Sequence, residues 1–335
     1  MGRESSFKNP ESSIQNQKHQ EPLMKIYHSL DDFTRLEYAV VTSGTFDGVH
    51  LGHQKILSRL KEISEKNKGE TVVITFWPHP RFILRPDDNT LKLLNTFEEK
   101  AELLKEQGIQ HLIRIPFTKE FSQLSSEEFI KKIIVNTIGT KKLVIGYDHR
   151  FGKNREGSFE QLKLNGPAYG FDVEEIPRQD VDHVGVSSTK IRQALEQGDL
   201  ETAHHLLGRS YSISGRVVKG DKLGRLMGFP TANIEIDTHY KLIPMDAIYA
   251  VKVTYAHQKF GGMLYIGNRP TVNGVKRNIE VNIFNFDRDI YGEDLAIHFI
   301  KLIRNDIKFE DLEALKLQLH LDKEDALNVL KDFKN

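Results

Sequence analysis

The sequence predicts a two-domain chain, a doubly wound parallel α/β sheet followed by an antiparallel β-barrel or sandwich. Three observations predict this fold class. Short apolar runs alternate with helical patterns from residue 38 to about residue 176. After Gly208 this alternation ends, and strand-like runs follow one another with Gly, Asn and Asp between them. The length of 335 residues suggests about two domains, at a prior of ~100–200 residues each.

The first half contains five apolar runs of strand length, separated by segments with helical spacing. They cover residues 38–41, 71–76, 111–115, 142–145 and 171–176. Two of the expected helices begin with capping boxes, in which Thr96 pairs with Glu99 and Ser125 with Glu128. Strand–helix alternation of this kind is typical of a parallel sheet that binds ligands at the carboxyl ends of its strands.

The second half begins after two helical segments, residues 189–196 and 200–207. Its strand-like runs cover residues 211–218, 248–254, 262–266, 279–286 and 295–300. An amphipathic helix is expected over about residues 311–332. We therefore expect one domain over residues 23–208 and a second over residues 209–335, preceded by a disordered polar tail over residues 1–22.

Composition limits the class of partner. Lys and Arg number 47 and so do Asp and Glu, so no basic footprint favours nucleic acid. The chain has no cysteine, which excludes disulfides and cysteine-ligated metal and is compatible with a reducing cytoplasm. It has no run of ~18 apolar residues, and its first residues lack the apolar core of a signal peptide. We expect a cytoplasmic protein with neither a nucleic acid nor a membrane as partner.

The segment Gly-Thr-Phe-Asp-Gly-Val-His-Leu-Gly-His, residues 44–53, lies between the first apolar run and a helical pattern. The N–H groups and dipole of a helix start favour a bound phosphate. His50 and His53 add two imidazoles that can donate hydrogen bonds to the α- and β-phosphates. Residue types, spacing and context disfavour the alternative of two surface histidines in a turn. Further ATP-binding candidates in this segment are Gly44, Phe46, Asp47 and Gly52.

The His-x-Gly-His spacing resembles the signature of the nucleotidyltransferase fold. Members of that fold direct attack on the α-phosphate of a nucleoside triphosphate and release pyrophosphate. Such a reaction requires that the reactants are aligned and that charge on the phosphates is stabilised. A second candidate anion site is the helix start Ser-Ser-Thr-Lys-Ile-Arg, with Ser188 and Thr189 as phosphate ligands and Arg192 as a catalytic cation. Alone, this segment would only be an N-cap.

Two more segments follow strands and therefore belong to the same rim. In Phe-Trp-Pro-His-Pro, Pro78 and Pro80 offer flat surfaces for a ring, and in Gly-Tyr-Asp-His-Arg-Phe-Gly, Phe151 does the same. Asp148 can bind a ribityl hydroxyl, the base or Mg²⁺. For His79 and His149 a purely structural role stays open.

Together these four motifs resemble the FMN adenylyltransferase half of prokaryotic bifunctional riboflavin kinase/FAD synthetases. The resemblance implies that ATP and FMN give FAD and pyrophosphate, with Pro78, Pro80, Asp148 and Phe151 near the flavin. One departure is His149, where that family usually has phenylalanine. This departure concerns flavin packing or base contact and not the phosphate motif.

The second half contains Gly-Asp-Lys-Leu-Gly-Arg-Leu-Met-Gly-Phe-Pro-Thr-Ala-Asn, residues 220–233. Its glycines let the backbone approach phosphates, and the hydroxyl of Thr231 and the amide of Asn233 are hard oxygen ligands suited to Mg²⁺. It is neither a Walker A motif nor a kinase glycine loop, and composition alone favours a glycine-rich turn. The phosphate-binding candidates are Gly220, Lys222, Gly224, Arg225 and Gly228.

Gly-Phe-Pro-Thr-Ala-Asn closely resembles the riboflavin kinase signature, and the later segments 266–271, 279–281, 289–292 and 303–304 agree with it in order. The resemblance implies a β-barrel, with Glu280 as the base that accepts the 5′-hydroxyl proton of riboflavin and Arg304 near the flavin. Ala247 departs from the glycine usual in that family, and alanine would be strained there if the position needs positive φ.

The sequence therefore predicts a bifunctional enzyme that phosphorylates riboflavin to FMN and adenylylates FMN to FAD, with ATP and Mg²⁺ in both steps. Two alternatives stay open. One is a nucleotidyltransferase for another phosphorylated acceptor, such as phosphopantetheine or nicotinamide mononucleotide, with a non-catalytic flavin-binding barrel. The other is a flavin storage protein, which would need neither phosphate site.

Overall fold

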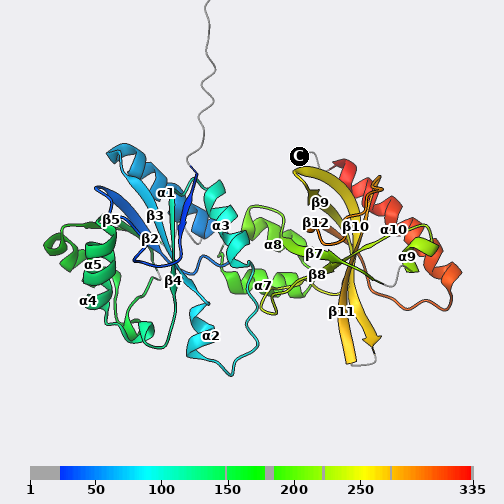
Figure 1. Ribbon diagram of the computed structural model, residues 1–335, viewed down its shortest axis with the longest axis horizontal. Helices are drawn as coiled ribbons and strands as arrows, with labels where there is room; N and C mark the ends of the chain where they lie inside the picture. Colours follow the sequence, from blue (N-terminus) through cyan, green and yellow to red (C-terminus); the bar gives the residue numbers. More distant parts are fainter. Residues whose placement is uncertain (1–22, 148, 178–184, 221–222, 272–273, 333–335) are drawn as a thin grey trace, which may run out of the picture.

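The computed structural model describes residues 23–147, 149–177, 185–220, 223–271 and 274–332, so the predicted tail lies outside the described residues. A sheet domain and a barrel lie side by side, with two helices between them (Figure 1). Among the described residues no helix has the length and apolarity needed to cross a bilayer. The cytoplasmic location stays a prediction.

The first domain is built on six parallel strands in the order β1-β4-β3-β2-β5-β6, which confirms the predicted doubly wound sheet. The strands are β1 (Lys25–Tyr27), β2 (Ala39–Ser43), β3 (Glu70–Trp77), β4 (His111–Pro116), β5 (Thr140–Gly146) and β6 (Asp172–Ile176). The sequence pattern missed β1, because this edge strand is only three residues long and Lys25 and Ile26 are exposed.

Helices cover both faces of this sheet. They are α1 (Leu51–Asn67), α2 (Pro80–Leu84), α3 (Phe97–Glu106), α4 (Ser126–Glu128) and α5 (Phe159–Asn165), with the π-helix η2 (Phe129–Ile138) and the 3₁₀ turns η1 (Phe121–Gln123), η3 (Lys153–Arg155) and η4 (Gly166–Tyr169). Leu57 and Leu104 pack on one face and Ile134 on the other, and each such buried side chain contributes roughly 1.5–3 kcal/mol. Both predicted capping boxes are present.

The second domain is a closed antiparallel barrel with strand order β10-β11-β8-β7-β12-β9, so the sandwich alternative is wrong. Its strands are β7 (Ser212–Val218), β8 (Ala232–Glu235), β9 (Ala247–Tyr255), β10 (Gln258–Thr271), β11 (Gly274–Ile283) and β12 (Asp294–Asn305). The pattern missed β8, which has four residues and no apolar run. The helix α9 (Leu223–Leu226) precedes β8, and the predicted terminal helix is α10 (Leu312–Asp332), which packs on the barrel wall.

The helices α7 (Ser188–Glu196) and α8 (Leu200–Leu207) lie between sheet and barrel (Figure 1). Their apolar residues, including Leu195 and Leu206, belong to the same buried cluster as Tyr249 and Phe299 of the barrel. Gly208 ends α8 with φ of 70°, a conformation that favours glycine. The domain boundary near residue 208 stays a prediction, because one apolar cluster crosses it.

The segment before α3 joins the two domains through backbone hydrogen bonds. The N–H of Leu93 donates to the carbonyl of Tyr240 at 2.6 Å, and the N–H of Leu242 donates to the carbonyl of Leu93 at 2.8 Å. The buried ammonium of Lys241 donates to the carboxylate of Glu99 at 2.5 Å. These contacts join the barrel to the segment before α3, in which the N–H of Leu94 donates to Asp47 of the phosphate motif.

Candidate active sites

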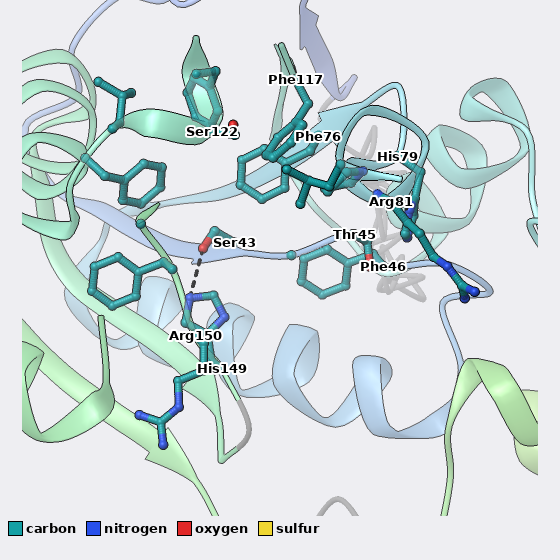
Figure 2. Close-up of a pocket in the computed structure, with 18 of the residues that line it drawn as sticks. Ser43, Thr45, Phe46, Phe76, His79, Arg81, Phe117, Ser122, His149 and Arg150 are labelled. Carbon is teal, nitrogen blue, oxygen red and sulfur yellow. Dashed lines mark hydrogen bonds between the residues drawn. The ribbon is translucent and has the colours of Figure 1, made fainter. Parts of the chain in front are cut away.

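A cavity of about 830 Å³ opens at the carboxyl ends of β2, β3 and β5. Gly44, Phe46 and His53 of the phosphate motif line it, as the position of that motif after β2 predicts. His149 and Arg150 lie on one side of the cavity and His79 and Arg81 on the other (Figure 2). Its aromatic lining consists of Phe46, Phe76, Phe117, Phe121, Phe129 and Phe151.

His50 and His53 form a stacked pair at the start of α1. Their ring centroids lie 3.6 Å apart with an interplanar angle of 15°, and Nδ1 of His50 accepts a hydrogen bond from the backbone N–H of His53 at 3.3 Å. Neutral His50 therefore carries its proton on Nε2. In His53, the buried Nδ1 has no hydrogen-bond partner among the described residues. Of the two rings, only His53 is among the residues that line the cavity, and contact of either ring with phosphate stays a prediction.

Burial keeps both rings neutral near pH 7. It lowers the pKa of His50 to about 4. Burial, assisted by nearby His50 and Lys100, holds the pKa of His53 well below its usual range. The pair can therefore act as hydrogen-bond donors towards phosphate oxygens without carrying charge.

Asp47 and Arg192, which are 145 positions apart, form a close ion pair. Oδ2 of Asp47 lies 2.6 Å from Nη2 of Arg192, and Oδ1 accepts from the N–H of Leu94 at 2.9 Å. Nε of Arg192 donates to the carbonyl of Lys92 at 2.6 Å. Neither Asp47 nor Arg192 is among the described residues that line the cavity. The assignment of Asp47 to phosphate binding and of Arg192 to catalysis stays a prediction. In this structure their ion pair joins the phosphate motif to α7 and to residues 92–94.

The helix start at residues 187–189 lies against the phosphate motif. The hydroxyl of Ser188 donates to the carbonyl of Asp47 at 2.9 Å, whereas Thr189 is exposed on the first turn of α7. Ser187 is the N-cap, since its side chain accepts from the N–H of Lys190. Gly52 is buried within α1. None of these positions is among the residues that line the cavity, and their contact with phosphate stays a prediction.

Only some of the residues predicted to bind the flavin line the cavity. Pro80 and Phe151 line the cavity, while Pro78 does not and Asp148 lies outside the described residues. His79 and His149 also line it, and Nε2 of His149 lies 3.3 Å from the hydroxyl of Ser43 (Figure 2). His149 therefore adds a polar ring to a largely aromatic wall.

Several lining residues were missed by the sequence interpretation. Phe117 directly follows β4, so the rule that ligands bind at carboxyl ends of strands could have found it. Arg81 and Phe121 come from α2 and η1, which are too short to show a periodic pattern. In Arg81 the guanidinium is paired with Asp88 at 2.6 Å.

In the barrel, three predicted residues meet where β8 pairs with β11. The hydroxyl of Thr231 donates to Oε2 of Glu280 at 3.0 Å, and Asn233 is the register partner of Glu280. Gly220 packs so closely on Asn233 that a Cβ there would overlap the amide group. This brings a carboxylate, a hydroxyl and an amide together beside the glycine-rich segment.

At two other positions of that segment, local structure explains why the residue is glycine. A Cβ on Gly224 would overlap the carbonyl of Phe229, and Gly228 has φ of 83°. Arg225 is exposed, and Lys222 lies outside the described residues. Phosphate binding by these five positions stays a prediction. Ala247 begins β9 fully buried and has no positive φ, so its replacement of glycine causes no backbone strain.

Arg304 makes an ion pair with the terminal helix. Its Nε and Nη2 donate to the two carboxylate oxygens of buried Asp322, each at 2.8 Å, and so join β12 to α10. Its guanidinium also lies 5.6 Å from the ring centre of Phe309. A flavin contact of Arg304 stays a prediction.

Two folds, each with its own polar site, define a chain with two active sites. Residues 32–190 match the FAD synthetase family and residues 207–330 match the riboflavin kinase family. The chain belongs to the family of bifunctional riboflavin kinase/FMN adenylyltransferases, because similarity to such proteins extends over nearly its whole length.

Two relatives of that name illustrate the similarity. The protein of Buchnera aphidicola subsp. Schizaphis graminum is 39% identical over 307 residues, which cover 90% of this chain and 97% of that protein. The protein of Escherichia coli K12 is 37% identical over 302 residues, which cover 90% and 95%. A crystal structure described as a macrolide-efflux protein from Streptococcus pneumoniae is 30% identical, with a TM-score of 0.81 over 91% of this chain and 99% of that one.

Proposed function

We propose that the barrel transfers the γ-phosphoryl group of ATP to riboflavin, and that the sheet domain transfers the adenylyl group of a second ATP to the resulting FMN. The products are FMN and ADP in the first step and FAD and pyrophosphate in the second. The observation that carries this assignment is the presence of two separate sites, the His50–His53 pair beside an aromatic cavity and the Thr231–Glu280 pair in the barrel.

In the adenylyl transfer, a phosphate oxygen of FMN attacks the α-phosphorus of ATP and the bond to the β-phosphate oxygen breaks. Nε2–H of His50, an N–H of His53 and the start of α1 would donate to phosphate oxygens as charge develops on the leaving pyrophosphate. Ser188, Thr189 and Arg192 would assist from the start of α7. The aromatic wall would hold the flavin ring, and a cavity of about 830 Å³ lies in the usual range for such ligands.

In the phosphoryl transfer, Glu280 would accept the 5′-hydroxyl proton of riboflavin while that oxygen attacks the γ-phosphorus and ADP leaves. Glu280 is buried and oriented by the Thr231 hydroxyl. The backbone of the glycine-rich segment, including Gly220 and Gly224, would cradle the phosphates. Arg225 and Lys222 would add positive charge there.

The oxygen donors of this cluster fit Mg²⁺. The Thr231 hydroxyl donates its hydrogen bond to Glu280, so its oxygen lone pairs are available, and Asn233 is the register partner of Glu280. No group of three His, Cys, Asp or Glu side chains that could hold a metal ion occurs in the described ranges. When bound, Mg²⁺ neutralises charge on the phosphates during transfer.

A panel of acceptors tests the assignment. With ATP and Mg²⁺ present, the chain is offered riboflavin, FMN, phosphopantetheine or nicotinamide mononucleotide, and the products are separated chromatographically. We expect FMN from riboflavin, FAD from FMN, and no adenylylated product from the last two. Adenylylation of phosphopantetheine or nicotinamide mononucleotide, with FMN left unchanged, would support the other-acceptor alternative. Flavin binding with no turnover would indicate a storage protein.

A further inference from the structure

The turn that precedes His50 has an unusual backbone. Phe46, Gly48 and Val49 have φ of 47°, 87° and 38°. Positive φ is ordinary for glycine, but in the β-branched Val49 it is a genuine outlier. Such a conformation persists only where surrounding contacts enforce it. The groups that enforce it here therefore set the position of His50 and of the first N–H groups of α1.

The carbonyl groups of this turn accept hydrogen bonds from side chains. That of Gly48 accepts from Nη2 of Arg209 at 2.7 Å. That of Val49 accepts from Nη1 of Arg209 at 3.3 Å and from Nε2 of Gln54 at 2.9 Å. Ser188 holds the carbonyl before them, at Asp47. A single guanidinium therefore bridges the two peptide groups that lead into His50.

Arg209 itself is positioned by the junction between α8 and β7. It follows Gly208, the left-handed residue that ends α8, and its Nη1 also donates to the carbonyl of Leu207 at 3.3 Å. Burial lowers the pKa of Arg209 to about 10, so the side chain stays charged at neutral pH. Arg209 falls outside residues 32–190, which match the FAD synthetase family, and inside residues 207–330, which match the riboflavin kinase family.

We propose that Arg209 is a positioning residue for adenylyl transfer, by which the riboflavin kinase half of the chain holds the phosphate motif of the other half in its working conformation. Arg209 acts through the carbonyls of Gly48 and Val49 and does not touch the substrate. The planar fork of a guanidinium can reach both carbonyls at once, whereas an ammonium is a single point of donation. This role rests on the proposed FMN adenylyltransferase function.

The test compares Arg209→Ala and Arg209→Lys in the full chain with Arg216→Met as matched control. Arg216 is an exposed arginine of β7, paired only at the surface with Asp294. We expect Arg209→Ala to lower kcat for FMN-to-FAD conversion by roughly 10–100-fold, since small displacements of catalytic groups cost up to ~10²-fold. Arg209→Lys should be intermediate. Riboflavin phosphorylation by both variants should stay within about twofold of the parent.

Chemical rescue distinguishes positioning from a merely structural role. Added methylguanidinium, at a concentration that does not lower the melting temperature, should restore part of the FAD formation by Arg209→Ala and leave Arg216→Met unchanged. FAD formation by Arg209→Ala at the parent rate would overturn the proposal. Loss of both activities together with no rescue would also overturn it. The parent chain is assayed in parallel, because its failure to convert FMN to FAD would overturn the proposed function instead.

Discussion

The hydroxyl of Thr231 donates a hydrogen bond of 3.0 Å to the carboxylate of Glu280, 49 positions further along the chain. Thr231 belongs to the Gly-Phe-Pro-Thr-Ala-Asn segment, and Glu280 lies on β11 beside β8. One residue is suited to a metal ion and the other to a proton. Their contact brings the predicted metal ligand and the predicted base together in one corner of the barrel.

Glu280→Gln should selectively impair riboflavin phosphorylation. Glutamine is nearly isosteric and its amide oxygen can still accept from Thr231, so packing should survive while the proton acceptor is lost. General-base assistance contributes ~10²–10⁴ in rate, and the loss should lie near the lower end because positioning dominates phosphoryl transfer. Supplied FMN should still become FAD at the parent rate. Exposed Glu293→Gln is the control. Unimpaired riboflavin turnover would exclude Glu280 as the base.

His53→Ala should give the reciprocal phenotype. It removes a donor aimed at phosphate charge, an effect worth on the order of 10²–10³ in rate. FMN should accumulate from riboflavin while FAD formation falls by that factor. The matched control is His205→Ala, since His205 is exposed on α8. If the variant makes FAD as fast as the parent, the role given to His53 is wrong.

A fragment of residues 209–335 should fold and phosphorylate riboflavin, because the predicted kinase motifs all lie within it. Its melting temperature should be lower than that of a fragment of residues 186–335, which keeps α7 and α8 on the apolar cluster of the barrel. Both fragments are compared by thermal melting and by FMN formation. A folded 209–335 fragment that binds riboflavin and Mg-ATP yet makes no FMN would refute an autonomous kinase.

Stability should fall as pH drops from about 6.5 towards 4, partly through His204. Burial lowers the pKa of His204 to about 4, and its buried Nε2 has no hydrogen-bond partner among the described residues. The unfolded chain therefore binds a proton at pH 5 that the folded chain does not, which costs roughly 1–2 kcal/mol. His204→Gln should lose less melting temperature between pH 7 and pH 5 than exposed His205→Gln. Equal losses would contradict the neutral state of His204.

Much of the fold and part of the site could be predicted from local sequence patterns. The β2–α1 junction, the capping boxes and the change of pattern after Gly208 depend on neighbouring residues, so the sequence could predict them. The short strands β1 and β8 were missed because their pairing partners, β4 for one and β7 and β11 for the other, decide their formation.

Long-range contacts could not be predicted from one sequence. The sequence marked Asp47 and Arg192 for phosphate, but no local signal could indicate that they pair with each other across 145 positions. Arg209 carries no motif at all, and only the folded chain places its guanidinium on the turn before His50. The sequence could therefore nominate residues by their chemistry, whereas the groups that position them appear only in the folded chain.

The most direct test of two transfers on one chain follows the phosphorus atoms of ATP. The protein is incubated with riboflavin, Mg²⁺ and ATP labelled with ³²P at either the α or the γ position, and the flavins are separated. We predict that γ-label enters FMN and remains in FAD, and that α-label enters FAD but never FMN. FMN labelled from the γ position with no FAD formed would contradict the adenylyltransferase half, and absence of label from both flavins would contradict the account as a whole.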